Sequence, residues 1–85
     1  MIFYPNDGDQ FKLDPILRPE YQSVKIVGVA PDKSTVVSLR VDNDVLDFKP
    51  AGVWWSLKRG KHMLRLEAMV GDTKRISKPV AIEVD

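Results

Sequence analysis

The sequence predicts an all-β domain, an immunoglobulin-like antiparallel β-sandwich of about seven strands, and three observations support this class. Apolar residues recur with a period of two along most of the chain, which is typical of half-buried strands. Turn-forming residues separate these runs at intervals of roughly 8–14 residues, which is near the spacing of strands in a sandwich. A chain of 85 residues has the length of one domain with a small core. We therefore expect a single domain over residues 1–85.

The N-terminal region is expected to contain short strand segments and a long loop. Apolar residues at Ile2 and Tyr4 precede the turn-forming run Pro5-Asn6-Asp7-Gly8, and a second apolar pair follows that turn. The segment from Asp14 to Glu20 contains two prolines and no alternation, so it suits a crossing loop with room for one short turn of helix. The strand segments expected here lie at 2–4 and, as a continuation, at 11–13.

The middle of the chain shows the clearest strand patterns. A run rich in β-branched residues extends from Val24 to Val29. Val37, Leu39 and Val41 then alternate with polar residues, and a tight turn follows them. The strands expected in this region lie at 22–29, 35–42 and 45–48.

The C-terminal third is expected to form a hairpin and a final strand. Leu64 and Leu66 share one parity in a long alternating run, and the glycine-containing turn before this run separates it from the preceding strand. Pro79 cannot donate a hydrogen bond to a ladder, so the last strand is expected to lie at an edge or to carry a bulge there. The strands expected in this region lie at 53–57, 61–70 and 74–84.

Two packed sheets bury alternate side chains in a shared core. The side chains that share the apolar parity of each strand are therefore the expected core. They are Ile2, Tyr4, Phe11, Leu13, Val24, Ile26, Val37, Leu39, Val41, Leu46, Trp55, Leu57, Leu64, Leu66, Val80, Ile82 and Val84.

Composition and charge exclude several classes of protein. The 13 basic and 12 acidic residues give a net charge of +1, which is too balanced for nucleic-acid binding. Cysteine is absent, which excludes disulfides, a thiolate nucleophile and a cysteine zinc site. No apolar run approaches the roughly 18 residues that span a membrane, so no membrane insertion by this segment is expected. The N-terminus lacks the features of a signal peptide, so the chain is either not exported or a piece of a larger exported protein.

No constellation of residues for catalysis, metal binding or a cofactor is present. His62 is the only histidine, and its parity with the following leucines points it to the edge of the core rather than to a catalytic triad. One histidine without cysteine also falls short of the roughly four ligands of a zinc site. We therefore expect no enzyme activity, no metal and no cofactor.

Acidic and basic clusters have simpler interpretations. The run from Asp42 to Asp47 superficially resembles a calcium loop, but Asp47 and Val53 occupy the positions of the required glycine and glutamate, so a tight β-turn is expected. Two carboxylate pairs, Asp7 with Asp9 and Asp42 with Asp44, lie in predicted turns. We expect these carboxylates to be solvated and not to act in general acid–base catalysis. The basic run Lys58-Arg59-Gly60-Lys61 is expected to be a solvated turn.

The two adjacent tryptophans are expected to point in opposite directions. Successive side chains of a strand alternate between faces, so Trp55 should enter the core while Trp54 shares the outer face with Ser56 and Lys58. An exposed aromatic ring beside Lys58 and Arg65 can stack on a sugar or anchor a partner. Three interpretations of Trp54 therefore remain: ligand binding, packing on another domain or partner, and no role.

The residues also resemble a known family. The opening Ile2-Phe3-Tyr4-Pro5-Asn6-Asp7-Gly8-Asp9-Gln10-Phe11-Lys12-Leu13-Asp14-Pro15 is similar to the start of the C-terminal domain of bifunctional penicillin-binding proteins of the 1C type. The strand Val24-Lys25-Ile26-Val27-Gly28-Val29, the turn Leu39-Arg40-Val41-Asp42-Asn43 and the hairpin from Trp55 to Leu66, with its Gly-x-His-x-Leu pattern, also resemble that family. The family's tryptophan and glycine are replaced here by Leu39 and Asn43. The resemblance covers nearly the whole chain.

The resemblance implies a role and a location. It implies an immunoglobulin-like, non-catalytic accessory domain, excised from the C-terminus of a periplasmic peptidoglycan synthase that carries glycosyltransferase and transpeptidase activities. The domain would dock on other domains of that synthase, on a periplasmic protein or on peptidoglycan. No catalytic residue of the family falls within this chain. The alternative is a free-standing or adhesin-like carbohydrate-binding module of the same fold.

Overall fold

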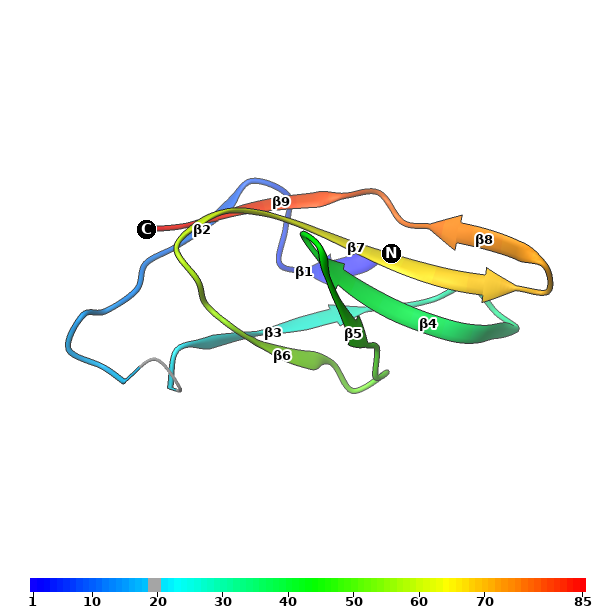
Figure 1. Ribbon diagram of the computed structural model, residues 1–85, viewed down its shortest axis with the longest axis horizontal. Coiled ribbons are helices and arrows are strands. Elements are labelled where there is room, and N and C mark those ends of the chain that lie inside the picture. The colour runs from blue at the N-terminus through cyan, green and yellow to red at the C-terminus, as the bar shows by residue number, and fades with distance from the viewer. Residues whose placement is uncertain (19–20) are drawn as a thin grey trace.

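The computed structural model describes residues 1–18 and 21–85 and shows an all-β domain. The described chain is elongated, with extents of 47 × 21 × 20 Å (Figure 1). Its strands are β1 (Ile2–Tyr4), β2 (Asp9–Phe11), β3 (Ser23–Gly28), β4 (Ser34–Val41), β5 (Asp44–Asp47), β6 (Val53–Ser56), β7 (Gly60–Val70), β8 (Thr73–Ile76) and β9 (Val80–Val84).

The strands form two sheets that pack as a sandwich, which confirms the predicted fold class. The smaller sheet has the order β1-β3-β6, and the larger has the order β2-β9-β7-β4-β5, with β8 also paired to β7. In the view of Figure 1, β3 and β6 lie below β4, β7 and β9. The pairs are antiparallel except that of β2 with β9, which is parallel.

The core lies between the two sheets and consists mostly of the side chains that alternation predicted; Ala68 is buried in addition, and Val37 is only half-buried. Most of the expected residues are buried, and Phe11, Leu13, Leu46 and Leu57 pack against them half-buried. The buried core residues are Ile2, Val24, Ile26, Leu39, Val41, Trp55, Leu64, Leu66, Ala68, Val80, Ile82 and Val84.

Tyr4 is an exception to the predicted core. Its side chain is exposed because the register between β1 and β3 shifts: Ile2 pairs with Gly28, whereas Tyr4 pairs with Val27, the neighbouring residue. This irregularity removes the simple alternation, so that Ile2 faces the core and Tyr4 does not. The prediction of a buried Tyr4 was therefore wrong.

The predicted strand 74–84 is divided into two. β8 pairs with Glu67–Val70 of β7, and β9 pairs with Gly60–Leu64 on the same side of β7. Pro79 lies in the link between β8 and β9, so it interrupts the strand instead of marking the edge position or bulge that was expected, and β9 is an inner strand between β2 and β7.

The loop before β3 is held by one buried polar side chain. Gln22 accepts a hydrogen bond from the Asp14 N–H at 2.6 Å, and its amide donates to the carbonyl oxygens of Asp14 at 2.9 Å and Leu17 at 3.1 Å. Residues 14–18 form a loop, as predicted, and the remainder of the predicted segment, residues 19–20, lies outside the described residues.

Candidate functional site

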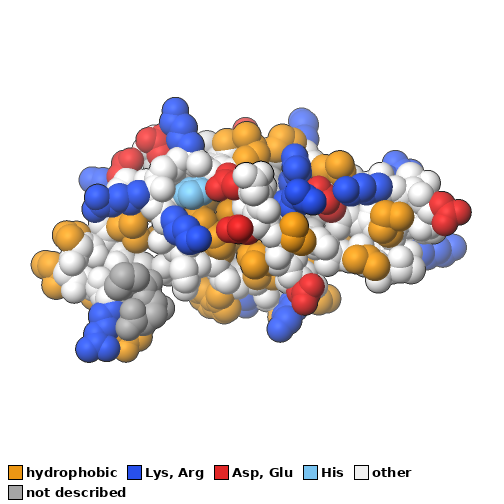
Figure 2. All heavy atoms as spheres, viewed as in Figure 1, with side chains coloured by type: hydrophobic (Ala, Val, Ile, Leu, Met, Phe, Trp, Pro, Cys, Tyr) orange, Lys and Arg blue, Asp and Glu red, His pale blue; other side chains and the backbone are white. Residues whose placement is uncertain are grey.

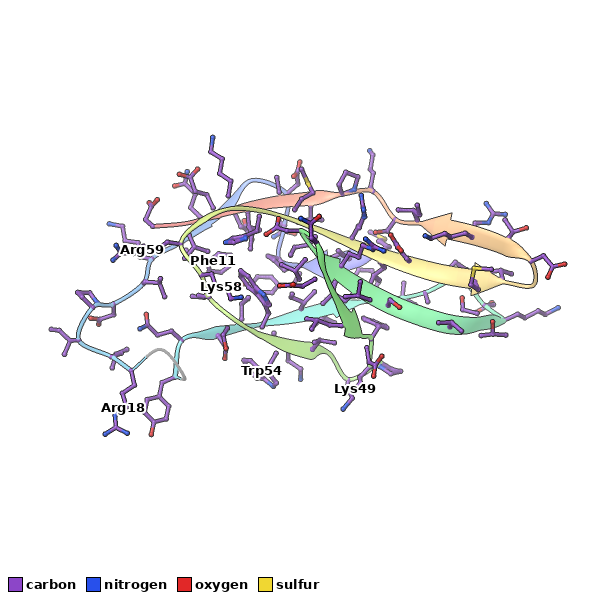
Figure 3. The ribbon with its side chains drawn as sticks, viewed as in Figure 1. Phe11, Arg18, Lys49, Trp54, Lys58 and Arg59 are labelled. Carbon is purple, nitrogen blue, oxygen red and sulfur yellow. The ribbon has the colours of Figure 1, made fainter. Side chains whose placement is uncertain are left out.

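The predicted hairpin is not formed: β6 belongs to the smaller sheet and β7 to the larger one, so the chain crosses from one sheet to the other after Ser56. Within β6, the two tryptophans lie on opposite faces of the smaller sheet. Trp55 is 7% exposed and belongs to the core, whereas Trp54 is 66% exposed. Figure 3 shows the Trp54 side chain directed away from the sandwich. The predicted alternation is therefore confirmed, and Trp54 is available to solvent on the outer face.

Lys25 is the immediate cationic neighbour of Trp54. The two residues are directly opposite in the β3–β6 ladder, and the Lys25 Nζ lies 5.9 Å from the centroid of the Trp54 ring. At this distance the ammonium is attracted to the electron-rich face of the indole. The stem of Lys25 also packs close to the backbone at Gly52, which has a φ of 107°. The positive φ at this position, just before β6, favours glycine over larger residues.

A shallow hollow lies between β6 and β5, beside Trp54. Its volume is about 420 Å³. Each of these strands is the last in its sheet, so the hollow marks one open edge of the sandwich. The residues that line it are Asp44, Val45, Leu46, Trp54, Trp55, Ser56 and Lys58. Lys58, one of the predicted contact residues, thus shares a surface with Trp54.

Arg65 lies elsewhere, although the sequence suggested that it accompanies Trp54. It points outward from β7, between the buried residues Leu64 and Leu66, and so faces the outer side of the larger sheet. Trp54 faces the outer side of the smaller sheet. The structure therefore brings Trp54 and Lys58 together and places Arg65 apart from both.

Arg65 belongs to a charge cluster around Glu67. The Glu67 carboxylate lies 3.1 Å from Arg40 Nε, 3.5 Å from Arg65 Nε and 3.2 Å from Lys74 Nζ. Burial opposes ionisation of Glu67, but the hydrogen bond of Lys74 and the three positive charges outweigh it and lower the pKa of this carboxyl. Charged side chains interspersed with hydrophobic ones are visible in Figure 2. The cluster joins β4, β7 and β8.

His62 has a structural environment, as its parity predicted. Its side chain is only 10% exposed, and its ring meets that of Trp55 edge-on with centroids 4.9 Å apart. Nε2 lies 2.7 Å from the carbonyl oxygen of Lys58, and Nδ1 lies 2.7 Å from Asp42 Oδ2. Both ring nitrogens therefore face oxygen atoms, which fix the ring between the β4–β5 turn and the backbone of Lys58.

The acidic residues of the predicted turns bond to the backbone. Asp7 Oδ1 accepts the N–H of Ala81 at 2.8 Å, and Asp9 Oδ2 accepts the N–H of Asn6 at 2.9 Å. Asp42, with a φ of 55°, occupies the β4–β5 turn predicted for the calcium-like run. Within residues 1–18 and 21–85, no group of three or more histidine, cysteine or carboxylate side chains could hold a metal ion.

Sequence reasoning missed the contribution of Lys25 to this surface. Lys25 is far from Trp54 along the chain, and the contact depends on the register of β3 against β6. Alternation could have placed Lys25 on the outer face of its own strand, since Val24 and Ile26 are apolar, but no local signal gives the pairing partner.

The fold and this surface define an all-β sandwich domain with an exposed tryptophan and neighbouring lysines at one open edge. Comparison of the chain with protein-family models, with curated proteins and with solved structures found no match. Among the described residues, no helix has the length and apolar character needed to cross a membrane.

Proposed function

We propose that this chain is a non-catalytic accessory domain of a periplasmic peptidoglycan synthase of the penicillin-binding type. It would act by docking the surface of Trp54, Lys25 and Lys58 on another domain of the synthase. The observation that carries the proposal is the exposure of Trp54, an aromatic side chain 66% open to solvent on a sheet face. Tryptophans in such positions are frequent anchors of protein interfaces.

The resemblance supports the choice of parent protein. It includes the opening segment through Pro15 and the segment from Trp55 to Leu66, which in this fold holds the end of β6, the crossing between the sheets and the start of β7. The Gly-x-His-x-Leu pattern lies at the start of β7, where His62 has a structural role against Trp55. The pattern is thus consistent with a non-catalytic domain.

The docking role can be tested with the catalytic portion encoded in the same gene. We expect the isolated domain to bind this portion, with a change in tryptophan fluorescence, and expect Trp54→Ala to weaken binding by about tenfold or more. Val36→Ala is the matched control, because Val36 is 60% exposed on the outer face of the larger sheet. A parent gene without glycosyltransferase and transpeptidase motifs would contradict the proposal.

The same two variants distinguish the docking role from the second candidate function, that of a carbohydrate-binding module. The Trp54 ring with Lys25 above it is favourable for this role, since an exposed indole face can stack on a sugar. Binding of soluble muropeptides, lost in Trp54→Ala and retained in Val36→Ala, with no affinity for the catalytic portion, would favour the carbohydrate module.

A further inference from the structure

β6 has one edge that is paired and one that is open. It pairs only with β3 among the described strands. The N–H of Leu57 donates to the carbonyl of Gln22 at 2.9 Å, which fixes the alternation of the antiparallel ladder. By that alternation Val53 and Trp55 bond to β3, while the backbone groups of Trp54 and Ser56 point away from it. These groups therefore form a row of free donors and acceptors.

The other open edges of the described sheets are blocked in ways that β6 is not. Edge strands are commonly protected by shortness, irregular register or charge. β1 and β2 have three residues each, and β1 carries a register shift. β8 carries Lys74 and Arg75, and β5 begins with Asp44 and ends with Asp47. β6, with the sequence Val-Trp-Trp-Ser, has no charge and no proline.

The hollow beside β6 provides room for the side chains of an added strand. Side chains of that strand that point inward would enter the space of about 420 Å³ and contact Leu46 and Trp55. Those that point outward would lie beside Trp54, and would cover part of its exposed ring. Because the inward contacts are mostly apolar, we expect apolar residues at alternate positions of the added strand.

Charge indicates the chemistry of the outward positions. Lys49 lies before β6 and Lys58 after it, as Figure 3 shows, and Lys25 lies over Trp54. Asp44 lines the hollow from the opposite strand, β5, so it disfavours acidic residues on the inward side only. A second copy of the chain would bring lysines against lysines. The surface therefore suits a segment that is not a second copy of this domain and that carries acidic residues on its outward side.

We propose that β6 binds, as an added strand, an extended segment of the synthase domain on which it docks, with apolar residues in the hollow and acidic residues beside Lys58. Main-chain hydrogen bonds to Trp54 and Ser56 would supply the affinity, and alternate side chains the specificity. The inference rests on the proposed binding role and narrows the partner to one that forms a strand.

The test uses a synthetic eight-residue peptide in which glutamate and valine alternate, with amide hydrogen exchange followed by NMR. We expect the amides of Trp54 and Ser56 to exchange about tenfold more slowly when the peptide is bound, while the amide of Trp55, already bonded to β3, changes little. The matching lysine–valine peptide and an N-methylated glutamate–valine peptide, which lacks main-chain donors, should bind at least about tenfold more weakly.

Ser56→Pro removes one free donor without touching the β3 ladder, and an edge strand tolerates proline at such a position. We expect it to abolish peptide binding, whereas Ser56→Ala should bind as the natural chain does. Equal binding of the peptide by both variants would overturn the inference. If Ser56→Pro does not fold, the exchange of the Trp54 and Ser56 amides in the natural chain tests the inference instead.

Three other results would also overturn it. They are peptide binding without slower exchange at Trp54 and Ser56, no binding of the peptide at millimolar concentration, and slow exchange of these amides caused by self-association of the free protein. None of these results bears on the experiment with the catalytic portion and Trp54→Ala. Failure of the added-strand inference is therefore distinguishable from failure of the proposed docking role.

Discussion

At the scale of single residues, Asp42 links the β4–β5 turn to the start of β7. Its Oδ1 accepts the N–H of Met63 at 2.9 Å, and its Oδ2 lies 2.7 Å from His62 Nδ1. Burial, the largest single influence, opposes ionisation, but the bonds to His62 and Met63 and the charges of His62 and Lys58 together outweigh it. The pKa of Asp42 is therefore lowered from its ordinary value of 3.8.

This lowered pKa predicts a pH-dependent stability. A carboxyl with a lower pKa in the folded state stabilises the fold fully above its unfolded pKa, and that stabilisation is lost as the pH falls through the folded pKa. We expect the free energy of unfolding of the natural chain to exceed that of Asp42→Asn near pH 6, and the difference to shrink as the pH falls below the ordinary carboxyl pKa of 3.8. Urea unfolding across this pH range measures it.

Asparagine is a suitable replacement because it tolerates the positive φ of this turn, so the substitution changes charge rather than backbone strain. A difference between the two proteins that stays constant from pH 2.5 to 6 would show that the carboxylate charge of Asp42 does not contribute.

The residues that alternation placed correctly are those whose environment depends on one strand. Trp54, Trp55 and His62 face the sides that their parity predicted. Alternation could not predict the neighbours of Lys25 and Arg65, because these neighbours are set by pairing between strands that are distant in sequence. A one-residue change of register would alter these neighbours without changing any local pattern.

At the scale of elements, β7 organises the larger sheet. Its 11 residues pair with β4 on one side, and with β9 followed by β8 on the other. Where β8 gives way to β9, the Ser77 hydroxyl accepts the N–H of Leu66 at 2.8 Å, and the Ser77 N–H donates to the carbonyl of Leu66 at 2.8 Å. Ser77 therefore continues the ladder across the break.

Ser77→Ala should destabilise the domain by about 1 kcal/mol, because the half-buried N–H of Leu66 loses its acceptor. Ser77→Thr, which keeps a hydroxyl, is the control and should lose less. The free energies of unfolding in urea give the comparison. If alanine were as well tolerated as threonine, the side chain of Ser77 would not contribute to the continuity of the sheet.

The element boundaries show what the sequence pattern could and could not predict. Alternation gave the long strands β3, β4 and β7 within a few residues. The continuity of the sheet between β8 and β9 depends on a hydrogen bond from the Leu66 N–H to the Ser77 hydroxyl, and the parallel pairing of β2 with β9 depends on chain segments at opposite ends of the sequence. Neither feature has a signal of period two.

At the scale of the whole molecule, the two sheets depend on one shared core. Leu66, on the larger sheet, is 3% exposed and is packed closely against Gly28 of the smaller one, since a Cβ built on Gly28 would lie 2.9 Å from its Cδ1. The same Cβ would lie 2.5 Å from the carbonyl oxygen of Met1. Contact between the sheets here is therefore direct and leaves no space for a larger residue.

The whole-molecule prediction concerns cooperativity. Leu66→Ala should reduce the free energy of unfolding by about 2–5 kcal/mol, a large part of the stability of a small domain. Because the core is shared, the amide of Trp55 in the smaller sheet and that of Leu39 in the larger should lose exchange protection by the same factor. Val36→Ala, at an exposed position of the larger sheet, should change stability by no more than about 0.5 kcal/mol. Loss of protection at Leu39 alone would instead show that the two sheets unfold independently.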